Sequence, residues 1–213
     1  MKILVLTQYA ENYNELSDIT VPVLKKYCER HGYDLCVHKI EMPYHYKKHY
    51  VIEKLNDYDL VFYIDIDAMV TNHKIKLESF LNEDKDFYIT KDINELNGGV
   101  FMLRLSDWGK AFNSEILSNI PYFENEQNYY NSIYENHSGK DKISVLPQSA
   151  FNSYPYQYYG ERFGKISGDK PVLKPSHEQG DWKIGDFVIH VPGLELSVRE
   201  NILSEVKNYI VYE

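Results

Sequence analysis

Two aspartates directly follow a continuous apolar run. The run covers residues 60–64, and Asp65 and Asp67 stand after it with Ile66 between them. Side chains two positions apart in extended backbone lie on the same side, so both carboxylates can approach one cation. Two carboxylates leave coordination positions open for water and phosphate oxygens, which is how Mg²⁺ and Mn²⁺ usually serve nucleotides. The spacing indicates a divalent-metal site, and a strand-to-turn cap is the alternative.

A histidine lies in a second apolar run, near the end of the chain. Residues 187–191 read Phe-Val-Ile-His-Val and include His190, and Pro192 and Gly193 follow. Neutral imidazole is a good ligand for borderline metals such as Mn²⁺. A glycine at position 193 can bring a backbone N–H close to a phosphate. The alternative for His190 is a core histidine with satisfied hydrogen bonds.

A third group combines polar side chains with paired glycines. Asp92 precedes Asn97, Gly98 and Gly99, and an apolar run follows. Glycines before a strand let a ligand approach the backbone closely. Aspartate and asparagine beside them suit a hydroxyl-rich ligand, because both can form two hydrogen bonds. An ordinary hairpin turn is the alternative.

These side chains must be positioned by an alternation of strands and helices. We expect strands at 2–6, 34–38, 60–64, 86–90, 99–103 and 187–191. We expect helices at 15–31, 46–56, 106–118, 124–135 and 197–211. The first helix is expected to have Ser17 as N-cap and to end at Gly32, and residues 137–185 are expected to form long loops around the site. The alternation predicts an α/β sheet with parallel members, which binds ligands at the carboxyl ends of its strands.

Composition limits the classes of partner. The chain has 213 residues and a formal charge of −9. The length suits one domain over residues 1–213. An acidic chain binds phosphate backbones poorly, so nucleic acid and anionic membranes are disfavoured. The 20 tyrosines suit a surface that holds polar, flat or ring-shaped ligands, with a composition bias as the alternative.

Cysteine usage and the absence of long apolar runs indicate the compartment. Cys28 and Cys36 do not form a C-x-x-C motif, and we expect both to be reduced core residues. The first apolar run, residues 3–6, is too short for a signal peptide, and no run approaches a membrane span. We therefore expect a cytoplasmic protein with no membrane span.

Taken in order, these pieces resemble the GT-A fold glycosyltransferases. The closest likeness is to family 34, which contains galactosyl-, xylosyl- and mannosyltransferases. The family pattern is matched from the first strand to about residue 193 by the following motifs: Tyr46-Lys47-Lys48, Asp65-Ile66-Asp67, Asp92…Asn97-Gly98-Gly99-Val100-Phe101…Arg104, Glu126-Gln127, Leu146-Pro147-Gln148…Phe151-Asn152-Ser153-Tyr154 and Gly185-Asp186-Phe187…His190…Gly193. The resemblance implies a Rossmann-like mixed sheet flanked by helices. It is compatible with a virus-encoded member or with the first domain of a longer glycosyltransferase.

The resemblance also implies a reaction. It implies transfer of a sugar from a UDP-sugar donor to a hydroxyl of a glycan or glycoprotein acceptor, with Mn²⁺ or Mg²⁺ as cofactor and with retention of anomeric configuration. No nucleophile is assigned, so the leaving phosphate is expected to help deprotonate the acceptor hydroxyl.

Roles for individual residues follow from the resemblance. Asp65, Asp67 and His190 are expected to hold the metal, with Ile66 between the two carboxylates as part of the donor site. Lys48 and Gly193 are expected at the donor diphosphate. Thr7, Gln8 and Tyr9 are expected to hold the uridine, with Tyr13 stacked on the base. Asp92, Asn97, Gly98 and Gly99 are expected to contact the donor sugar, with Gln127 near the anomeric carbon. Asp92 and Gln127 are the expected catalytic residues.

Two other readings of the aspartate motif stay open. A phosphatase of the haloacid dehalogenase type also ends a strand in D-x-D, but it continues with Thr or Val where this chain has Met69. A non-catalytic sugar-binding domain would use the tyrosines without a metal. Substitution of Asp67 by Asn separates the binder from the transferase, because the binder would keep its sugar whereas the transferase should lose metal-dependent UDP binding. A dinucleotide dehydrogenase is disfavoured because no G-x-G-x-x-G follows the first strand.

Overall fold

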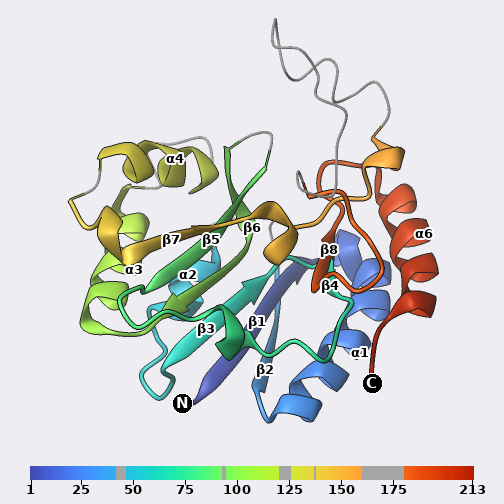
Figure 1. Ribbon diagram of the computed structural model, residues 1–213, viewed down its shortest axis with the longest axis horizontal. Helices are drawn as coiled ribbons and strands as arrows, with labels where there is room; N and C mark the ends of the chain where they lie inside the picture. The colour runs from blue at the N-terminus through green and yellow to red at the C-terminus, as the bar shows by residue number, and fades with distance from the viewer. Residues whose placement is uncertain (42–46, 93–94, 120–125, 137, 160–179) are drawn as a thin grey trace, which may run out of the picture.

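The fold is built on a six-stranded sheet with strand order β2-β1-β3-β6-β5-β7 (Figure 1). The computed structural model describes all residues except 42–46, 93–94, 120–125, 137 and 160–179. Five strands run in one direction and β6 alone runs antiparallel to its neighbours. The strands are β1 (Ile3–Ala10), β2 (Asp34–Ile40), β3 (Leu60–Ile64), β5 (Phe87–Asp92), β6 (Glu95–Arg104) and β7 (Ile143–Leu146).

Helices cover both faces of this sheet. On one face, α1 (Asn14–His31) packs Tyr27 against Val5 of β1 and Phe62 of β3. The opposite face is covered by α2 (Lys47–Ile52), α3 (Asp107–Asn119) and α4 (Glu126–Asn136). Because β1 and β3 are covered on both sides, their residues are buried without alternation, as in the core strands of α/β proteins.

A second, two-stranded sheet lies at the carboxyl end of β3. It pairs β4 (Ala68–Val70) with β8 (Val188–His190) in antiparallel register, and Ala68 is opposite His190. The amide of Val191 also donates to the carbonyl of Asp67 (3.0 Å). This pairing brings the C-terminal histidine to the end of β3. The last helix, α6 (Leu196–Val206), follows β8 and packs beside α1.

The expected elements are confirmed, with several corrections. β7 lies inside 137–185, which we expected to be loops, and β4 was not predicted. Both are short strands stabilised by pairing with distant partners, β5 and β8. β6 begins at Glu95 rather than at 99, so Asn97, Gly98 and Gly99 lie within a strand and not before one.

Helix boundaries also differ from expectation. α1 begins at Asn14, and Ser17 is not its N-cap, because the Ser17 hydroxyl donates to the carbonyl of Asn14 inside the first turn (2.7 Å). Gly32 ends α1 in the left-handed conformation (φ 72°), as predicted. α2 ends at Ile52, and the last expected helix divides into α6 and the 3-10 helix η8 (Lys207–Tyr209). Tyr46 lies outside the described residues.

Two further expectations concern cysteines and membranes. Cys28 is buried, Cys36 is partly buried, and both are free thiols. Among the described residues, no helix combines the length and the apolar character that a membrane crossing requires.

Candidate active site

Asp65 and Asp67 stand in the turn between β3 and β4. The amide of Asp65 donates to the carbonyl of Gly99 (2.8 Å), and the amide of Ala68 donates to the carbonyl of Asp65 (3.0 Å). The hydroxyl of Tyr63 donates to Oδ1 of Asp65 (2.5 Å). The backbone and one carboxylate of this turn are therefore held by the sheet itself.

His190 completes a three-residue cluster with these aspartates. Its Nδ1 lies 2.6 Å from Oδ1 of Asn152, and an amide oxygen can only accept, so Nδ1 carries the hydrogen. Its Nε2 is buried without a hydrogen-bond partner among the described residues and lies 3.3 Å from Oδ1 of Asp67. One ligand atom from each of Asp65, Asp67 and His190 lies within 4.8 Å of the others. Two carboxylates and a neutral imidazole form a donor set that suits Mn²⁺ or Mg²⁺.

Electrostatics distinguish the two carboxylates. Burial and the neighbouring charge of Asp67 raise the pKa of Asp65, although the ammonium of Lys48 partly opposes them. Burial also acts to raise the pKa of Asp67, but His190 in its protonated form and Arg199 outweigh it, so that pKa lies below its usual value when no metal is bound. Two acids with opposite shifts in one cluster are typical of functional sites. A divalent cation would remove the repulsion between the two carboxylates, and its binding would release protons.

Gly99 forms one wall of the cluster. A Cβ at this position would lie 2.5 Å from Cε1 of His190 and 2.8 Å from Oδ2 of Asp65. Only a residue without a side chain leaves these two groups where they are. The unpartnered imidazole nitrogen, the close approach at Gly99 and the donor set all fit a bound divalent cation.

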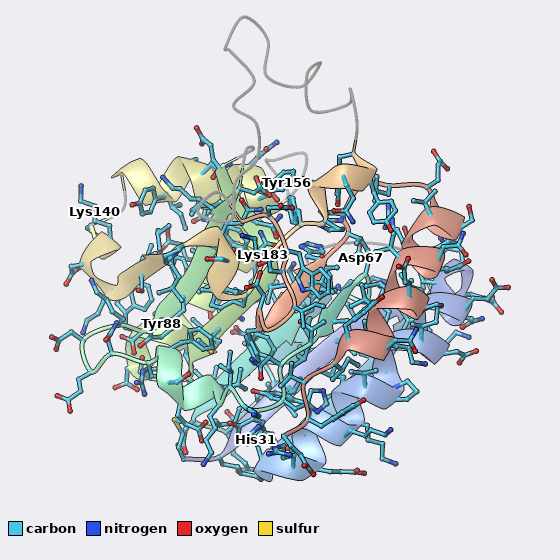
Figure 2. The ribbon with its side chains drawn as sticks, turned by 45° about the vertical axis from the view of Figure 1, so that its right-hand side comes forward. His31, Asp67, Tyr88, Lys140, Tyr156 and Lys183 are labelled. Atoms are coloured by element: carbon cyan, nitrogen blue, oxygen red, sulfur yellow. The ribbon has the colours of Figure 1, made fainter. Side chains whose placement is uncertain are left out.

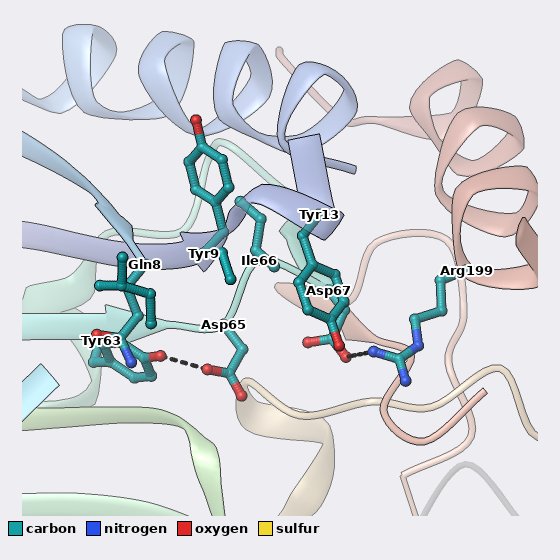
Figure 3. Close-up of a pocket in the computed structure, with 10 residues that line it drawn as sticks. Gln8, Tyr9, Tyr13, Tyr63, Asp65, Ile66, Asp67 and Arg199 are labelled. Atoms are coloured by element: carbon teal, nitrogen blue, oxygen red, sulfur yellow. Dashed lines mark hydrogen bonds and ion pairs between the residues drawn. The ribbon is translucent and has the colours of Figure 1, made fainter. Parts of the chain in front are cut away.

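A pocket opens beside the cluster (Figure 3). Gln8 and Tyr9 from the end of β1 and Tyr13 from the 3-10 helix η1 (Glu11–Tyr13) line it together with both aspartates and Ile66. Thr7 is buried and does not line this pocket. The structure thus groups three of the four residues expected at the uridine.

A second polar cluster lies next to the metal ligands, and Oδ1 of its Asn97 would be 3.0 Å from a Cβ at Gly99. Oδ2 of Asp92 accepts from the hydroxyl of Tyr154 (2.5 Å) and from Nδ2 of Asn97 (2.8 Å). The Asn97 amide also donates to the Tyr154 hydroxyl (2.9 Å). The amide of Gly98 faces Oε1 of Gln127 at 3.5 Å. The residues expected at the donor sugar are therefore adjacent to one another and to the metal ligands.

Lys48 and Gly193 occupy different surroundings. Lys48 is 1% exposed; its Nζ donates to the carbonyl of Gly98 (2.7 Å) and lies 4.3 Å from the centre of the Tyr63 ring. This lysine is thus buried behind Asp65 rather than extended into the pocket. Gly193 adopts φ +70°, and a Cβ there would meet no atom within 4 Å, so there is free space on that side of its Cα.

Sequence reasoning missed Arg199, Asn152 and Tyr154 as site residues. Arg199 of α6 lines the pocket, and its Nη1 donates to Oδ2 of Asp67 (2.9 Å; Figure 3). Nothing in the local sequence marks this arginine, which looks like any cation on an amphipathic helix. Asn152 and Tyr154 belong to a motif that the family resemblance quoted, so that motif was the available signal.

The sequence comparisons identify the family. Residues 79–197, more than half of the chain, match the galactosyl transferase GMA12/MNN10 family, which is glycosyltransferase family 34. The chain belongs to this family. The matched range includes Asp92, Asn97, Gln127 and His190 and begins after the two aspartates of the metal cluster.

One curated relative of this family 34 protein is an uncharacterised α-1,2-galactosyltransferase of Schizosaccharomyces pombe. The two are 22% identical over 246 aligned residues, which cover 92% of this chain and 67% of the relative. The protein is accordingly a glycosyltransferase, as predicted.

Solved structures share the fold. A glycosyltransferase involved in glycosylation of the major capsid of PBCV-1 superposes with a TM-score of 0.71 and 16% identity, covering 96% of this chain and all of that one. The galactosyltransferase LgtC, solved with donor and acceptor sugar analogues, gives a TM-score of 0.60 and 12% identity, covering 99% and 97%. The glycosyltransferase GlyE of Streptococcus pneumoniae gives a TM-score of 0.60 and 14% sequence identity, and the match covers 99% of this chain and 66% of that one. These likenesses confirm the GT-A fold of the family 34 protein.

Proposed function

We propose that this family 34 glycosyltransferase transfers a hexose or related sugar from a UDP-sugar to a hydroxyl of a glycan or glycoprotein acceptor. The reaction is metal-dependent and retains the anomeric configuration. Residues 1–213 act as one domain in this proposal. The observation that carries it is the cluster of Asp65, Asp67 and His190 at the mouth of a pocket lined by tyrosines.

In this proposal, Asp65, Asp67 and His190 hold Mn²⁺ or Mg²⁺. A bound divalent ion supplies Lewis-acid stabilisation of the negative charge that grows on a diphosphate leaving group. The chain's own residues prepare that position, because Tyr63 orients one carboxylate and Asn152 fixes the imidazole tautomer.

The pocket residues bind and orient the donor. Tyr9 and Tyr13 offer aromatic faces for a base, and Gln8 offers hydrogen bonds at the end of β1. Gly193 is placed at the diphosphate in this proposal, because a residue without a side chain leaves room for a phosphate group beside the backbone. Lys48, buried behind Asp65, contributes positive charge from below the site rather than by direct contact.

The second cluster receives the donor sugar. Asp92 accepts hydrogen bonds from Asn97 and Tyr154 and keeps acceptor capacity for sugar hydroxyls. Gln127 belongs to the first turn of helix α4, and its side-chain oxygen faces the amide of Gly98, so this proposal places it near the anomeric carbon. The spatial order of base, diphosphate and sugar subsites follows the carboxyl edge of the sheet, where α/β proteins bind ligands.

Turnover of a panel of UDP-sugars tests this proposal. Each UDP-sugar is incubated with the protein and Mn²⁺, and release of UDP is measured with and without EDTA. We expect slow hydrolysis of at least one UDP-hexose that EDTA abolishes and that Asp67→Asn removes. Release of inorganic phosphate from simple phosphate esters would instead indicate the phosphatase, and sugar binding unaffected by EDTA and by Asp67→Asn would indicate a non-catalytic binder.

A further inference from the structure

The two oxygens of the Asp67 carboxylate face different partners. Oδ2 accepts from Nη1 of Arg199 at 2.9 Å, and Oδ1 lies 3.3 Å from the unpartnered Nε2 of His190. Figure 3 shows the guanidinium approaching Asp67 from the side of α6, opposite to Tyr63 and Asp65. One oxygen of this carboxylate is therefore occupied by the protein, and the other faces the metal cluster.

Arg199 is itself held in place. Its Nε donates to the carbonyl of Leu194 at 2.6 Å, so the guanidinium is fixed across the start of α6 by a backbone atom of the preceding segment. The side chain is only 16% exposed, and that of Asp67 is 11% exposed. Because the pair is mostly buried and the guanidinium is planar, Arg199 and Asp67 keep a fixed relative orientation better than an ion pair on the surface does.

We propose that Arg199 is a positioning residue of the metal site, which holds Oδ2 of Asp67 so that only Oδ1 is offered to a cation. This inference rests on the proposed metal-dependent function. It assigns to α6, which provides none of the ligands, a role in the choice of metal.

A carboxylate that offers only one oxygen changes the relative affinities of a site for different divalent cations. Ca²⁺ takes about 6–8 oxygens and readily uses both oxygens of a carboxylate, whereas Mg²⁺ needs near-octahedral geometry and is bound through few carboxylate oxygens. With Oδ2 occupied, the site favours the smaller ions and leaves positions for donor oxygens. Without Arg199, the carboxylate of Asp67 can rotate and present both oxygens to a cation. The affinity for Ca²⁺ then rises relative to the affinity for Mn²⁺.

The ratio of two affinities separates this effect from simple charge. Loss of the guanidinium removes a positive charge near the cluster, which strengthens binding of every divalent cation. Dividing the dissociation constant of Ca²⁺ by that of Mn²⁺ cancels this common contribution. Arg199→Lys supplies a further comparison, because it keeps the charge but cannot bridge Leu194 and Asp67 in the same fork geometry.

The experiment measures free Mn²⁺ by electron paramagnetic resonance in the presence of UDP, followed by displacement with Ca²⁺. The variants are Arg199→Gln and Arg199→Lys. The first control is Arg104→Gln. Arg104 donates to the carbonyls of Lys85 and Asn82. It pairs with Leu60, the first residue of β3, and therefore lies at the opposite end of that strand from Asp65 and Asp67. The second control is Leu203→Ala, which loosens the packing of α6 and leaves the guanidinium.

In Arg199→Gln we expect the Ca²⁺-to-Mn²⁺ ratio to fall about tenfold, in line with the effect of altering an outer partner of a metal ligand. In Arg199→Lys the ratio should lie between the values of the wild type and of Arg199→Gln. In both control variants the ratio should equal that of the wild type. An unchanged ratio in Arg199→Gln, or an equal fall in Leu203→Ala, overturns the inference and leaves the proposed function standing. Failure of the wild type to bind Mn²⁺ with UDP overturns both.

Discussion

Nδ1 of His190 donates to the side-chain oxygen of Asn152 across 2.6 Å, and this bond directs Nε2 toward Asp67. Backbone pairing supports it, because the amide of His190 donates to the carbonyl of Ser153 (2.8 Å). The segment after β7 thus fixes both the position and the tautomer of the histidine. Such outer partners of metal-binding histidines orient the ring and raise its basicity.

Replacing Asn152 by Leu should therefore weaken Mn²⁺ binding about 10- to 100-fold. The ring would lose the acceptor that keeps Nε2 deprotonated. Titration with Mn²⁺ by electron paramagnetic resonance measures the effect. Asn113→Leu is a matched control, because Asn113 makes the same bond to a buried histidine, His49, at 2.7 Å. Equal losses of Mn²⁺ affinity in both variants would show that only stability had changed.

Gly99→Ala should abolish metal-dependent UDP binding. The new methyl group would overlap His190 and Asp65, and the strand would have to shift, at a cost of about 1–3 kcal/mol in unfolding free energy. Gly32→Ala provides the comparison, since Gly32 has φ +72° but no atom within 4 Å of a Cβ. It should cost about 1–2 kcal/mol and leave UDP binding intact. Retention of UDP binding by Gly99→Ala would contradict the tight wall at this position.

Tyr154→Phe should reduce turnover more than it reduces donor affinity. The hydroxyl bridges Asp92 and Asn97, so its loss leaves the carboxylate misaligned for the sugar. We expect a loss of about 1.5–3 kcal/mol in unfolding free energy, typical of a hydrogen bond to a charged group. In Tyr88→Phe, which removes a hydroxyl bonded to the carbonyls of Asn82 and Lys85, stability should fall but kcat should not. Steady-state kinetics with the active UDP-sugar distinguish the two, and an unchanged kcat in Tyr154→Phe would refute the role.

His73 should make stability pH-dependent at a place remote from the site. Burial lowers its pKa from 6.5 to about 4. Its Nε2 has no hydrogen-bond partner among the described residues. Between these values the unfolded chain binds a proton that the folded chain does not, so stability falls as pH decreases from 6.5 to 4. The total effect is up to about 3 kcal/mol.

His73→Phe should remove this dependence. Phenylalanine can keep the edge contacts that the His73 ring makes with Tyr27 and Tyr212. Denaturant unfolding at several pH values should give a slope smaller by about 1.4 kcal/mol per pH unit between pH 4 and 6.5. Figure 2 labels His31, whose Nε2 contacts the His73 carbonyl, at the end of the molecule away from Asp67. An identical slope in the variant would assign the acid sensitivity to other groups.

The parts of the fold and site that were predictable depend on local patterns. The apolar strand before Asp65 and Asp67 signals both its own burial and the place where the carboxylates emerge. Gly32 ends α1 as expected because it supplies a positive φ. β7 was missed because a run of only four residues is ambiguous by pattern alone, and pairing with β5 makes it a strand.

The outer contacts of the site were not predictable, because they join distant segments. Arg199 lies 132 positions from Asp67, and the pairing of β8 with β4 together with the packing of α6 beside α1 brings them together. Lys48 was expected at the diphosphate from its motif, which stays a prediction, whereas the bond from its ammonium to the carbonyl of Gly98 had no signal in the sequence. A motif indicates which residues gather at a site, whereas tertiary packing decides which of them face the ligand.

Thermal unfolding with UDP, with and without Mn²⁺, tests the central claim most directly. Ligand at about 100 times its dissociation constant adds roughly 2.7 kcal/mol to the unfolding free energy. For a chain of this size that corresponds to an increase of about 5–11 °C in Tm. We predict this shift only when UDP and Mn²⁺ are both present, and we predict its loss in Asp67→Asn. No shift in the wild type with both ligands, or an equal shift with UDP alone, would contradict a metal-dependent nucleotide-sugar site.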